Sequence, residues 1–326
     1  MNAQEHAFAV EASRDRVVKT GLTIVGMLAD RIVDRAAARL AAALAPPRRR
    51  LVPFVVDGYA AGYLDESRAA RVAAFANVFV MTAASITFRP SLDTRALRTA
   101  ALDVVVRTLA AEGALTRWRD ERYSVTSSDA VPPIFEIERA AARYFGIATR
   151  AVHLNATTVA DDGSARMWIA RRSPAKSIDP GLLDNLVGGG VAAGLSVADT
   201  LVKEAREEAG LLPELASRAR LEGTVSIFRE QPDGIQRETV HVHDVELPPT
   251  FVPRNEDGEV VDYLLESVVT VAEWIGNAEG ERVVTADASL VIVDWLMRHG
   301  HVTPAHTAFA ALRELRAARA PGYAGD

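Results

Sequence analysis

The feature that most constrains this chain is a short segment in which glycines lead into a charged helix. It reads VGGGVAAGLSVADTLVKEAREEAGL, from Val187 to Leu211. Ser196 and Asp199 have the spacing of a capping box, and Gly210 stands where helices commonly end in a left-handed residue. The sequence therefore predicts a helix between Ser196 and Gly210. The glycines before it would let backbone N–H groups approach a ligand closely.

Three glutamates of this predicted helix share one face. Glu204, Glu207 and Glu208 stand at i, i+3 and i+4, so their carboxylates point to the same side and repel one another. One interpretation is a solvated helix face with i,i+4 charge pairs. The glycine-rich loop favours the other, a phosphate and metal site, because oxygen ligands select hard cations such as Mg²⁺ or Mn²⁺ and the cation compensates the carboxylates.

Composition narrows the class of protein. The chain has 326 residues, which is more than one average domain, and it has no cysteine. Disulfides, thiolate metal sites and cysteine nucleophiles are thereby excluded. The net charge of −6 gives no sign of nucleic-acid binding. Residues 20–29 form an apolar run too short to span a membrane, and the start of the chain lacks a signal-peptide pattern. We expect a cytoplasmic protein with neither nucleic-acid nor membrane partners.

Periodicity and turn residues predict the order of the elements. The expected helices cover residues 14–44, 94–112, 135–146, 196–210, 288–299 and 304–318. The expected strands flank the turn at Asp57–Gly58 and cover 118–127, 151–159, 165–173, 223–230, 238–247 and 258–268. Residues 127–133, SSDAVPP, read as a linker. We therefore expect an α+β domain over 1–130, a main domain over 131–300, and a C-terminal helix and tail over 301–326.

The spacing within the glycine loop and helix resembles the Nudix box, usually written Gly-x5-Glu-x7-Arg-Glu-hydrophobic-x-Glu-Glu-x-Gly-hydrophobic. The matching positions are Gly189, Glu204, Ala205, Glu207, Glu208, Gly210 and Leu211. The resemblance implies that Glu204, Glu207 and Glu208 bind the metal ion, and that Glu207 or Glu208 also serves catalysis.

Two positions of the box depart from the pattern. Leu195 stands at its first Glu and Lys203 at its Arg. In the family these two residues are described as a structural ion pair, so both departures affect one pair and leave the metal-binding glutamates intact. Apolar packing by Leu195 can replace an ion pair without loss of stability. In this alignment with the box, Lys203 stands at an altered ion-pair position whose partner has become Leu195.

The resemblance extends over about residues 51–300. MWIARRSPAKSIDPGLLDNLVGGG, ELPPTFVPRNEDGEV, VIVDWLMRHG, VDGYAAGYL and FRPSLDTRALRTAAL are similar to a Nudix subfamily related to the module fused to thiamine pyrophosphokinase in fungi. This implies an α/β fold, a Nudix α/β/α sandwich with a mixed sheet, preceded by a smaller α+β domain. Such relatives hydrolyse diphosphates, and some act on thiamine diphosphate or its oxidised forms.

Several residues near the box are candidates for binding a diphosphate substrate. They are Arg171, Arg172, Lys176, Asn185, Gly189 and Gly190. For the three cations the alternative is a solvated basic turn, and for Asn185 it is a turn role. Because side chains alternate along a strand, only one of Arg171 and Arg172 is expected to face the substrate.

The acidic loop RNEDGEV follows later in the chain. Nudix enzymes often draw a catalytic base or an extra metal ligand from such a loop, which makes Glu256 and Glu259 candidates. A solvated acidic turn is the alternative interpretation.

The expected reaction is metal-dependent attack of water on a diphosphate, with Mg²⁺ or Mn²⁺ as cofactor. For thiamine diphosphate the products are thiamine monophosphate and phosphate. Hydrolysis of nucleotide sugars or oxidised nucleotides is one alternative, because substrate choice resides outside the box. A non-catalytic Nudix-like ligand sensor is another, although such relatives commonly lose the glutamates that this chain keeps. The expected partner is a small-molecule diphosphate, and formation of a homodimer is a possibility that the sequence leaves open.

Overall fold

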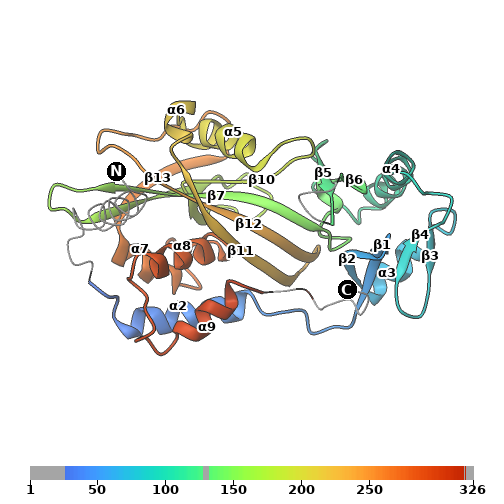
Figure 1. Ribbon diagram of the computed structural model, residues 1–326, viewed down its shortest axis with the longest axis horizontal. Coiled ribbons are helices and arrows are strands. Elements are labelled where there is room, and N and C mark those ends of the chain that lie inside the picture. Colours follow the sequence, from blue (N-terminus) through green and yellow to red (C-terminus); the bar gives the residue numbers. More distant parts are fainter. Residues whose placement is uncertain (1–25, 128–131, 319, 321–326) are drawn as a thin grey trace, which may run out of the picture.

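The computed structural model describes residues 26–127, 132–318 and 320. Figure 1 shows a large sheet with helices on both faces and, at one end of it, a smaller part built around a second sheet. The smaller part comprises residues 51–147 and is called the N-terminal part below. The predicted α/β architecture, with an α+β region beside a mixed sheet, is confirmed.

The large sheet is mixed and has seven strands. Its strands are β7 (Ala148–Val159), β8 (Ala165–Arg172), β9 (Leu183–Asn185), β10 (Val187–Gly190), β11 (Arg220–Gln231), β12 (Gly234–Glu246) and β13 (Val260–Ser267). The main order is β11-β12-β7-β8-β13, with β10 paired to β7 and β9 paired to β8. The β12–β7 pair is parallel and the other pairs are antiparallel.

Helices cover both faces of this sheet (Figure 1). They are α5 (Val197–Ala209) and α6 (Pro213–Ala216) on one face, and α7 (Val268–Ile275) and α8 (Ala286–Arg298) on the other, with α2 (Asp30–Ala43) and α9 (Phe309–Leu315) beyond. Strand β7 supplies both layers, since Val152 packs in the cluster under α5 and Ala151 in the cluster under α8. No helix of the described residues is long and apolar enough to cross a membrane.

Helix α2 packs on the large sheet's helices, although it precedes the N-terminal part in sequence. Its apolar face, with Val33 and Leu40 fully buried, joins the cluster of α7, α8 and α9. The N–H of Leu28 donates to the carbonyl of His301 at 3.0 Å. The chain therefore begins its described course in the large part and then crosses to the smaller one. Residues 14–25 of the predicted first helix lie outside the described residues.

The N-terminal part has its own core. Its elements are β1 (Leu51–Val56), β2 (Tyr59–Asp65), α3 (Glu66–Ala73), β3 (Phe79–Met81), β4 (Ile86–Phe88) and α4 (Arg95–Ala111). Phe54 lies at the centre, with the rings of Phe79 and Phe88 edge-on to it at 5.8 and 5.2 Å. Asp57 and Gly58 have φ of +50° and +81°, as a two-residue hairpin turn requires, so the predicted turn is confirmed.

The short helix predicted over 135–146 is wrong in its first half. Residues Phe135–Glu138 form strand β6, which pairs with β5 (Arg122–Val125), and a single 3₁₀ turn, Arg139–Ala141, follows. Phe135 and Ile137 are buried while Glu136 is partly exposed, which is the period-2 pattern of a strand. The segment read as a linker therefore connects two paired strands; its residues 128–131 lie outside the described part.

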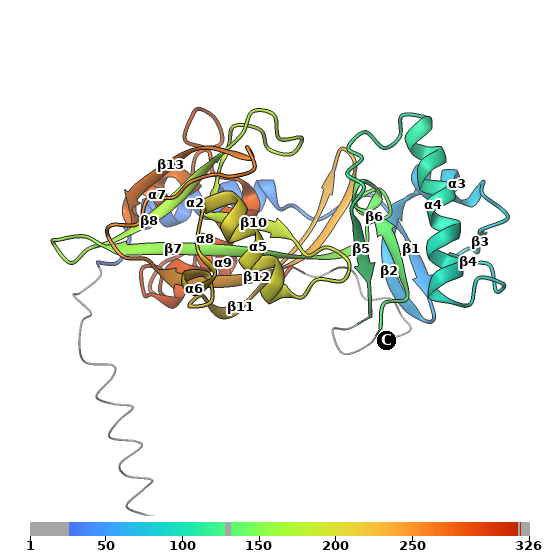
Figure 2. The same ribbon diagram turned by 90° about the horizontal axis from the view of Figure 1, so that it is seen from above.

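The end of the β11–β12 hairpin joins the two parts (Figure 2). There the N–H of Ile235 donates to the carbonyl of Arg143 at 2.8 Å. Gly234 lies so close that a Cβ on it would be 1.9 Å from the same oxygen. A cluster of Tyr63, Phe228 and Ile235 is buried beside this contact. The N-terminal part is thereby fixed against the large sheet.

Candidate functional site

Helix α5 forms as the sequence predicts and presents its glutamates beside β10. Ser196 and Asp199 make the reciprocal capping box, and Gly210 ends the helix with φ +63°. The ammonium of Lys203 lies 3.1 Å from a carboxylate oxygen of Glu204 and 2.8 Å from one of Glu207. Lys203 thus acts as a direct counter-charge for two of the three glutamates, besides standing at the altered position of the box.

Glu208 is the buried member of the set, with only 5% of its surface exposed. The backbone N–H of Gly188 donates to its Oε2 at 2.8 Å, and the ammonium of Lys176 lies 3.5 Å from its Oε1. Burial raises the pKa of Glu208 to about 7, although Lys176 and the Gly188 N–H act in the opposite direction. The Glu208 carboxyl therefore gains or loses its proton close to neutral pH.

Gly189 of β10 lies against Glu204. A Cβ on Gly189 would be 2.5 Å from both Cγ and Cδ of Glu204. Burial raises the pKa of Glu204, while its bond to Lys203 lowers it. A glycine at this position lets the Glu204 carboxyl lie directly on the strand.

The donor set of α5 fits a hard divalent cation. Glu204, Glu207 and Glu208 supply only oxygen atoms, and two lysine ammonium groups compensate them. Among the residues that the structure describes, no three His, Asp or Glu side chains already converge as a metal site. The fit therefore rests on the chemistry of the donors and on the packing of Glu204 and Glu208 against β10.

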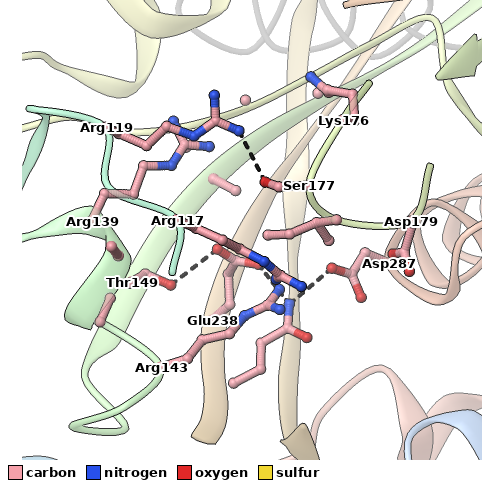
Figure 3. A pocket seen from close by; sticks show the side chains of 18 of the residues that line it. Arg117, Arg119, Arg139, Arg143, Thr149, Lys176, Ser177, Asp179, Glu238 and Asp287 are labelled. Carbon is pink, nitrogen blue, oxygen red and sulfur yellow. Dashed lines mark hydrogen bonds between the residues drawn. The ribbon is translucent and has the colours of Figure 1, made fainter. Parts of the chain in front are cut away.

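A charged pocket opens beside this strand, between the N-terminal part and the large sheet (Figure 3). Gly188, Gly189 and Gly190 form part of its wall. The charged residues that line it are Arg117, Arg119, Arg139, Arg143, Arg172, Lys176, Asp179, Asp184, Asp233, Glu238, Glu259 and Asp287. Cations and carboxylates thus line the same pocket, next to the glutamates of α5.

The predicted substrate-binding residues separate into two groups. Arg172, Lys176, Gly189 and Gly190 line the pocket. The guanidinium of Arg171 turns elsewhere and donates to the carbonyls of Gly181 and Glu281, at 3.0 and 3.1 Å. Alternation along β8 therefore directs Arg172 to the pocket and Arg171 away from it.

Arg172 also holds the loop that forms the pocket's wall. It bonds to Asp184 at 2.7 Å and to the carbonyls of Ile178 and Asp179, at 2.9 and 3.2 Å. Burial lowers its pKa, but Asp184 outweighs that effect and the net pKa is raised. Most donors of Arg172 are therefore engaged within the protein.

Asn185 lies inside the sheet. It is 2% exposed, its Oδ1 accepts from Nδ1 of His153 at 2.8 Å, and its Nδ2 donates to Oδ1 of Asn155 at 2.8 Å. The chain of hydrogen bonds continues to Asp244. These contacts give Asn185 a role in a buried polar network behind the pocket wall.

The acidic loop places its two candidates differently. Glu259 lines the pocket and pairs with Lys176, which it shares with Glu208. Glu256 is exposed, 3.5 Å from Arg206, and its backbone N–H donates to the carbonyl of Glu207 at 2.8 Å. Of the two, Glu259 stands closer to the buried part of the site.

Sequence reasoning missed the contribution of the N-terminal part. Arg117, Arg119, Arg139 and Arg143 all reach the pocket from the segment around β5 and β6 (Figure 3). The spacing of Arg139 and Arg143, four residues apart, was the available signal. It could not show which surface they face, because that depends on how the two parts dock.

Two family models together match most of this chain. The family model of the NUDIX domain matches residues 151–288, and that of a domain of unknown function, DUF4743, matches residues 34–149. The chain is 38% identical to Nudix hydrolase 24, chloroplastic, of Arabidopsis thaliana, over 81% of this chain and 72% of that protein. It is 36% identical to Nudix hydrolase 20, chloroplastic, of the same plant, over 80% and 71%. Among solved structures it is similar to DR0079 of Deinococcus radiodurans, with 25% identity over 52% of this chain and 97% of that chain and a TM-score of 0.39.

Proposed function

Because this chain belongs to the Nudix family and is a Nudix-type hydrolase, we propose that it cleaves the diphosphate bond of a small organic diphosphate in the pocket beside α5. Water is the nucleophile, and the products are the organic monophosphate and phosphate. Thiamine diphosphate or an oxidised analogue is the first candidate substrate. The resemblance over residues 51–300 supports this choice of substrate.

The observation that carries the proposal is the setting of Glu208. This carboxylate is buried, receives the N–H of Gly188 and adjoins the glycine strand that walls the pocket. Burying a carboxylate among other carboxylates lowers the stability of a folded protein, because desolvation and repulsion both cost free energy. A cation-dependent site at the pocket explains the arrangement.

In this proposal Glu204, Glu207 and Glu208 hold a divalent ion, as members of the family generally use Mg²⁺ or Mn²⁺. An ion held by these carboxylates would supply charge neutralisation for the diphosphate and a lowered pKa for the attacking water. Lys176 and Arg172 orient the phosphate groups from the pocket wall.

The proton of the attacking water goes to a carboxylate of the site. Glu207 and Glu208 are the candidates on α5, and Glu259 is the candidate on the acidic loop. The contact of Glu259 with Lys176 supports its inclusion, whereas Glu256 lies on the exposed side of α5, near Arg206.

The test is a panel of substrates assayed with and without Mg²⁺. It comprises thiamine diphosphate, its oxo form, nucleoside diphosphate sugars and oxidised nucleotides, with phosphate release or product chromatography as the readout. We expect metal-dependent cleavage of a diphosphate, abolished in Glu207→Gln and Glu208→Gln while circular dichroism shows a folded protein. Glu214→Gln, an exposed glutamate on α6, is the matched control.

Three outcomes count against the proposal or its first candidate substrate. Near-normal turnover in both glutamine variants would remove α5 as the catalytic helix. Cleavage of nucleotide derivatives alone would replace thiamine diphosphate with the other substrate class, and silence across the panel with tight binding of one member would favour a sensor.

A further inference from the structure

The N-terminal part forms one wall of the pocket, and four arginines project from it. Arg117 and Arg119 precede β5, while Arg139 and Arg143 follow β6. Figure 3 shows all four guanidinium groups directed into the space that separates them from Lys176 and Asp287. These arginines belong to the region matched by the domain of unknown function, outside the matched Nudix domain.

Ion pairs engage only some of the four arginines. Arg139 pairs with Glu121 at 2.5 Å. Arg117 and Arg143 share a single carboxylate, that of Asp233, at 3.2 and 3.8 Å. The guanidinium of Arg119 has no ion pair within the described part of the chain and donates to the neutral hydroxyl of Ser177 at 3.0 Å, while its backbone N–H donates to Glu138. Two carboxylates thus pair with three of the four arginines, and Glu238 and Asp287 also line the pocket.

Two of the arginines lie at the end of the pocket that faces the glutamates of α5. Figure 3 shows Arg119 beside Arg139, with Lys176 across the pocket from them. Lys176 contacts Glu208, and Glu204 is close enough to Arg139 to help raise the pKa of its guanidinium against the opposing effect of burial. A phosphate group at this end would lie between cations from both parts and beside the carboxylates of α5.

We propose that Arg119 and Arg139 form an anion subsite that binds the phosphate groups of the substrate opposite Lys176. The N-terminal part is then a component of the active site, and the substrate class is an organic ligand with two adjacent phosphate groups. The reaction that the bound ligand undergoes rests on the proposed function. The binding of phosphate groups by the two arginines does not. Guanidinium groups suit it because they bind phosphate oxygens in a bidentate manner.

The wall is held in place before any ligand binds. The hydroxyl of Tyr123 packs on Gly190, and the N–H of Ala193 donates to the carbonyl of Arg122 at 2.7 Å. On the other side of the pocket, Gly234 packs against the backbone of Arg143. Because these contacts fix the backbone on both sides of the arginines, little ordering of the chain is needed when an anion binds.

The experiment measures binding of methylenediphosphonate, a diphosphate analogue that water does not cleave, by isothermal titration calorimetry in buffer with EDTA. We expect Arg119→Gln and Arg139→Gln each to weaken binding by about tenfold, as for loss of one charge-assisted hydrogen-bonding group. Arg119→Lys retains part of the affinity, because it keeps the charge but not the bidentate geometry. Arg71→Gln is the control, since Arg71 pairs with Glu112 in the same part and lies outside the pocket.

Arg119→Gln decides the test alone if Arg139→Gln fails to fold, because Arg119 is exposed and its guanidinium donates to the hydroxyl of Ser177, while its bond to Glu138 comes from the backbone N–H and survives the substitution. Unchanged affinity in Arg119→Gln, or an equal loss in Arg71→Gln, would overturn the subsite. In a second series, the same arginine substitutions are made in the Glu207→Gln variant and the same binding is measured. Arginine-dependent binding there, in a protein that hydrolyses no diphosphate, would support the subsite even if the proposed reaction failed. Hydrolysis without arginine-dependent binding would support the reaction and remove the subsite.

Discussion

The hydroxyl of Tyr123, on β5 of the N-terminal part, occupies the space beside the Cα of Gly190, on β10 of the large sheet. A Cβ on Gly190 would lie 2.2 Å from that hydroxyl and 3.0 Å from the ring carbon that carries it. No side chain larger than hydrogen fits there without movement of the ring. The glycine that the sequence assigned to close approach of a ligand is thus also required for close approach of the other part.

Gly190→Ala should therefore destabilise the protein by overpacking, by about 1–3 kcal/mol. Tyr123→Phe removes the atom that lies closest to the new methyl group, so the same glycine substitution should cost much less in that background. Thermal or urea unfolding of the two single variants and the double variant measures the coupling. Equal costs of Gly190→Ala in the two backgrounds would show that the tyrosine hydroxyl does not set the limit.

Gly189→Ala should affect turnover more than stability. Its new methyl group would meet Cγ and Cδ of Glu204 at 2.5 Å, and the flexible end of that side chain can move away. Moving Glu204 displaces one of the three proposed metal ligands. We expect a loss of kcat/KM of about tenfold or more, with the melting temperature within a few degrees of the wild type. Full activity with a large loss of stability would contradict this expectation.

The box helix could be predicted from sequence because its determinants are local. The Ser196–Asp199 capping box and the left-handed Gly210 both occur as expected, and local hydrogen bonds suffice to specify them. The segment after residue 134 was misread because RAAAR suggests a helix, whereas Phe135 and Ile137 pair as a strand with β5. Tertiary pairing overrode the local propensity there.

The composition of the pocket could not be predicted in the same way. Arg119 and Arg139 reach it only because the β11–β12 hairpin docks the N-terminal part on the large sheet. Contacts between segments about a hundred residues apart leave no periodic signal in one sequence. The contacts of Lys203 could not be predicted either, since its position in the box does not show that its ammonium bonds to both Glu204 and Glu207.

Lys176→Met should destabilise the protein when divalent ions are chelated. The ammonium of Lys176 lies between Glu208 and Glu259, and its loss leaves Glu208 as a buried, unpaired carboxyl. Breaking a buried pair in this way costs about 3 kcal/mol. Added Mg²⁺ should restore part of the stability if α5 holds the cation.

The double variant Lys176→Met/Glu208→Gln is the control for that experiment. It removes both charges, so its stability in EDTA should return most of the way to the wild-type value. Thermal unfolding with and without Mg²⁺ gives both readouts. A double variant as unstable as Lys176→Met would mean that the lysine stabilises the fold through packing of its carbon chain, not through Glu208.

His301 should make the stability of the protein depend on pH below neutrality. Its ring is buried against Trp295, with the two ring centroids 5.4 Å apart, and neither ring nitrogen has a side-chain partner among the described residues. Burial, with the nearby His299 acting in the same direction, lowers the pKa of His301 to about 4 from an ordinary 6.5. Between these two values the unfolded chain binds a proton that the folded protein does not.

The contribution of His301 is therefore complete above about pH 6.5 and is lost progressively as the pH falls to about 4, by roughly 3 kcal/mol in total. His301→Phe keeps an aromatic ring against Trp295 but cannot be protonated, so its free energy of unfolding should fall less steeply over this range. Urea unfolding at a series of pH values measures the two slopes. Val302→Ala, at the buried neighbour, should lower stability equally at every pH. Parallel curves for wild type and His301→Phe would show that the ring is protonated without cost in the folded state.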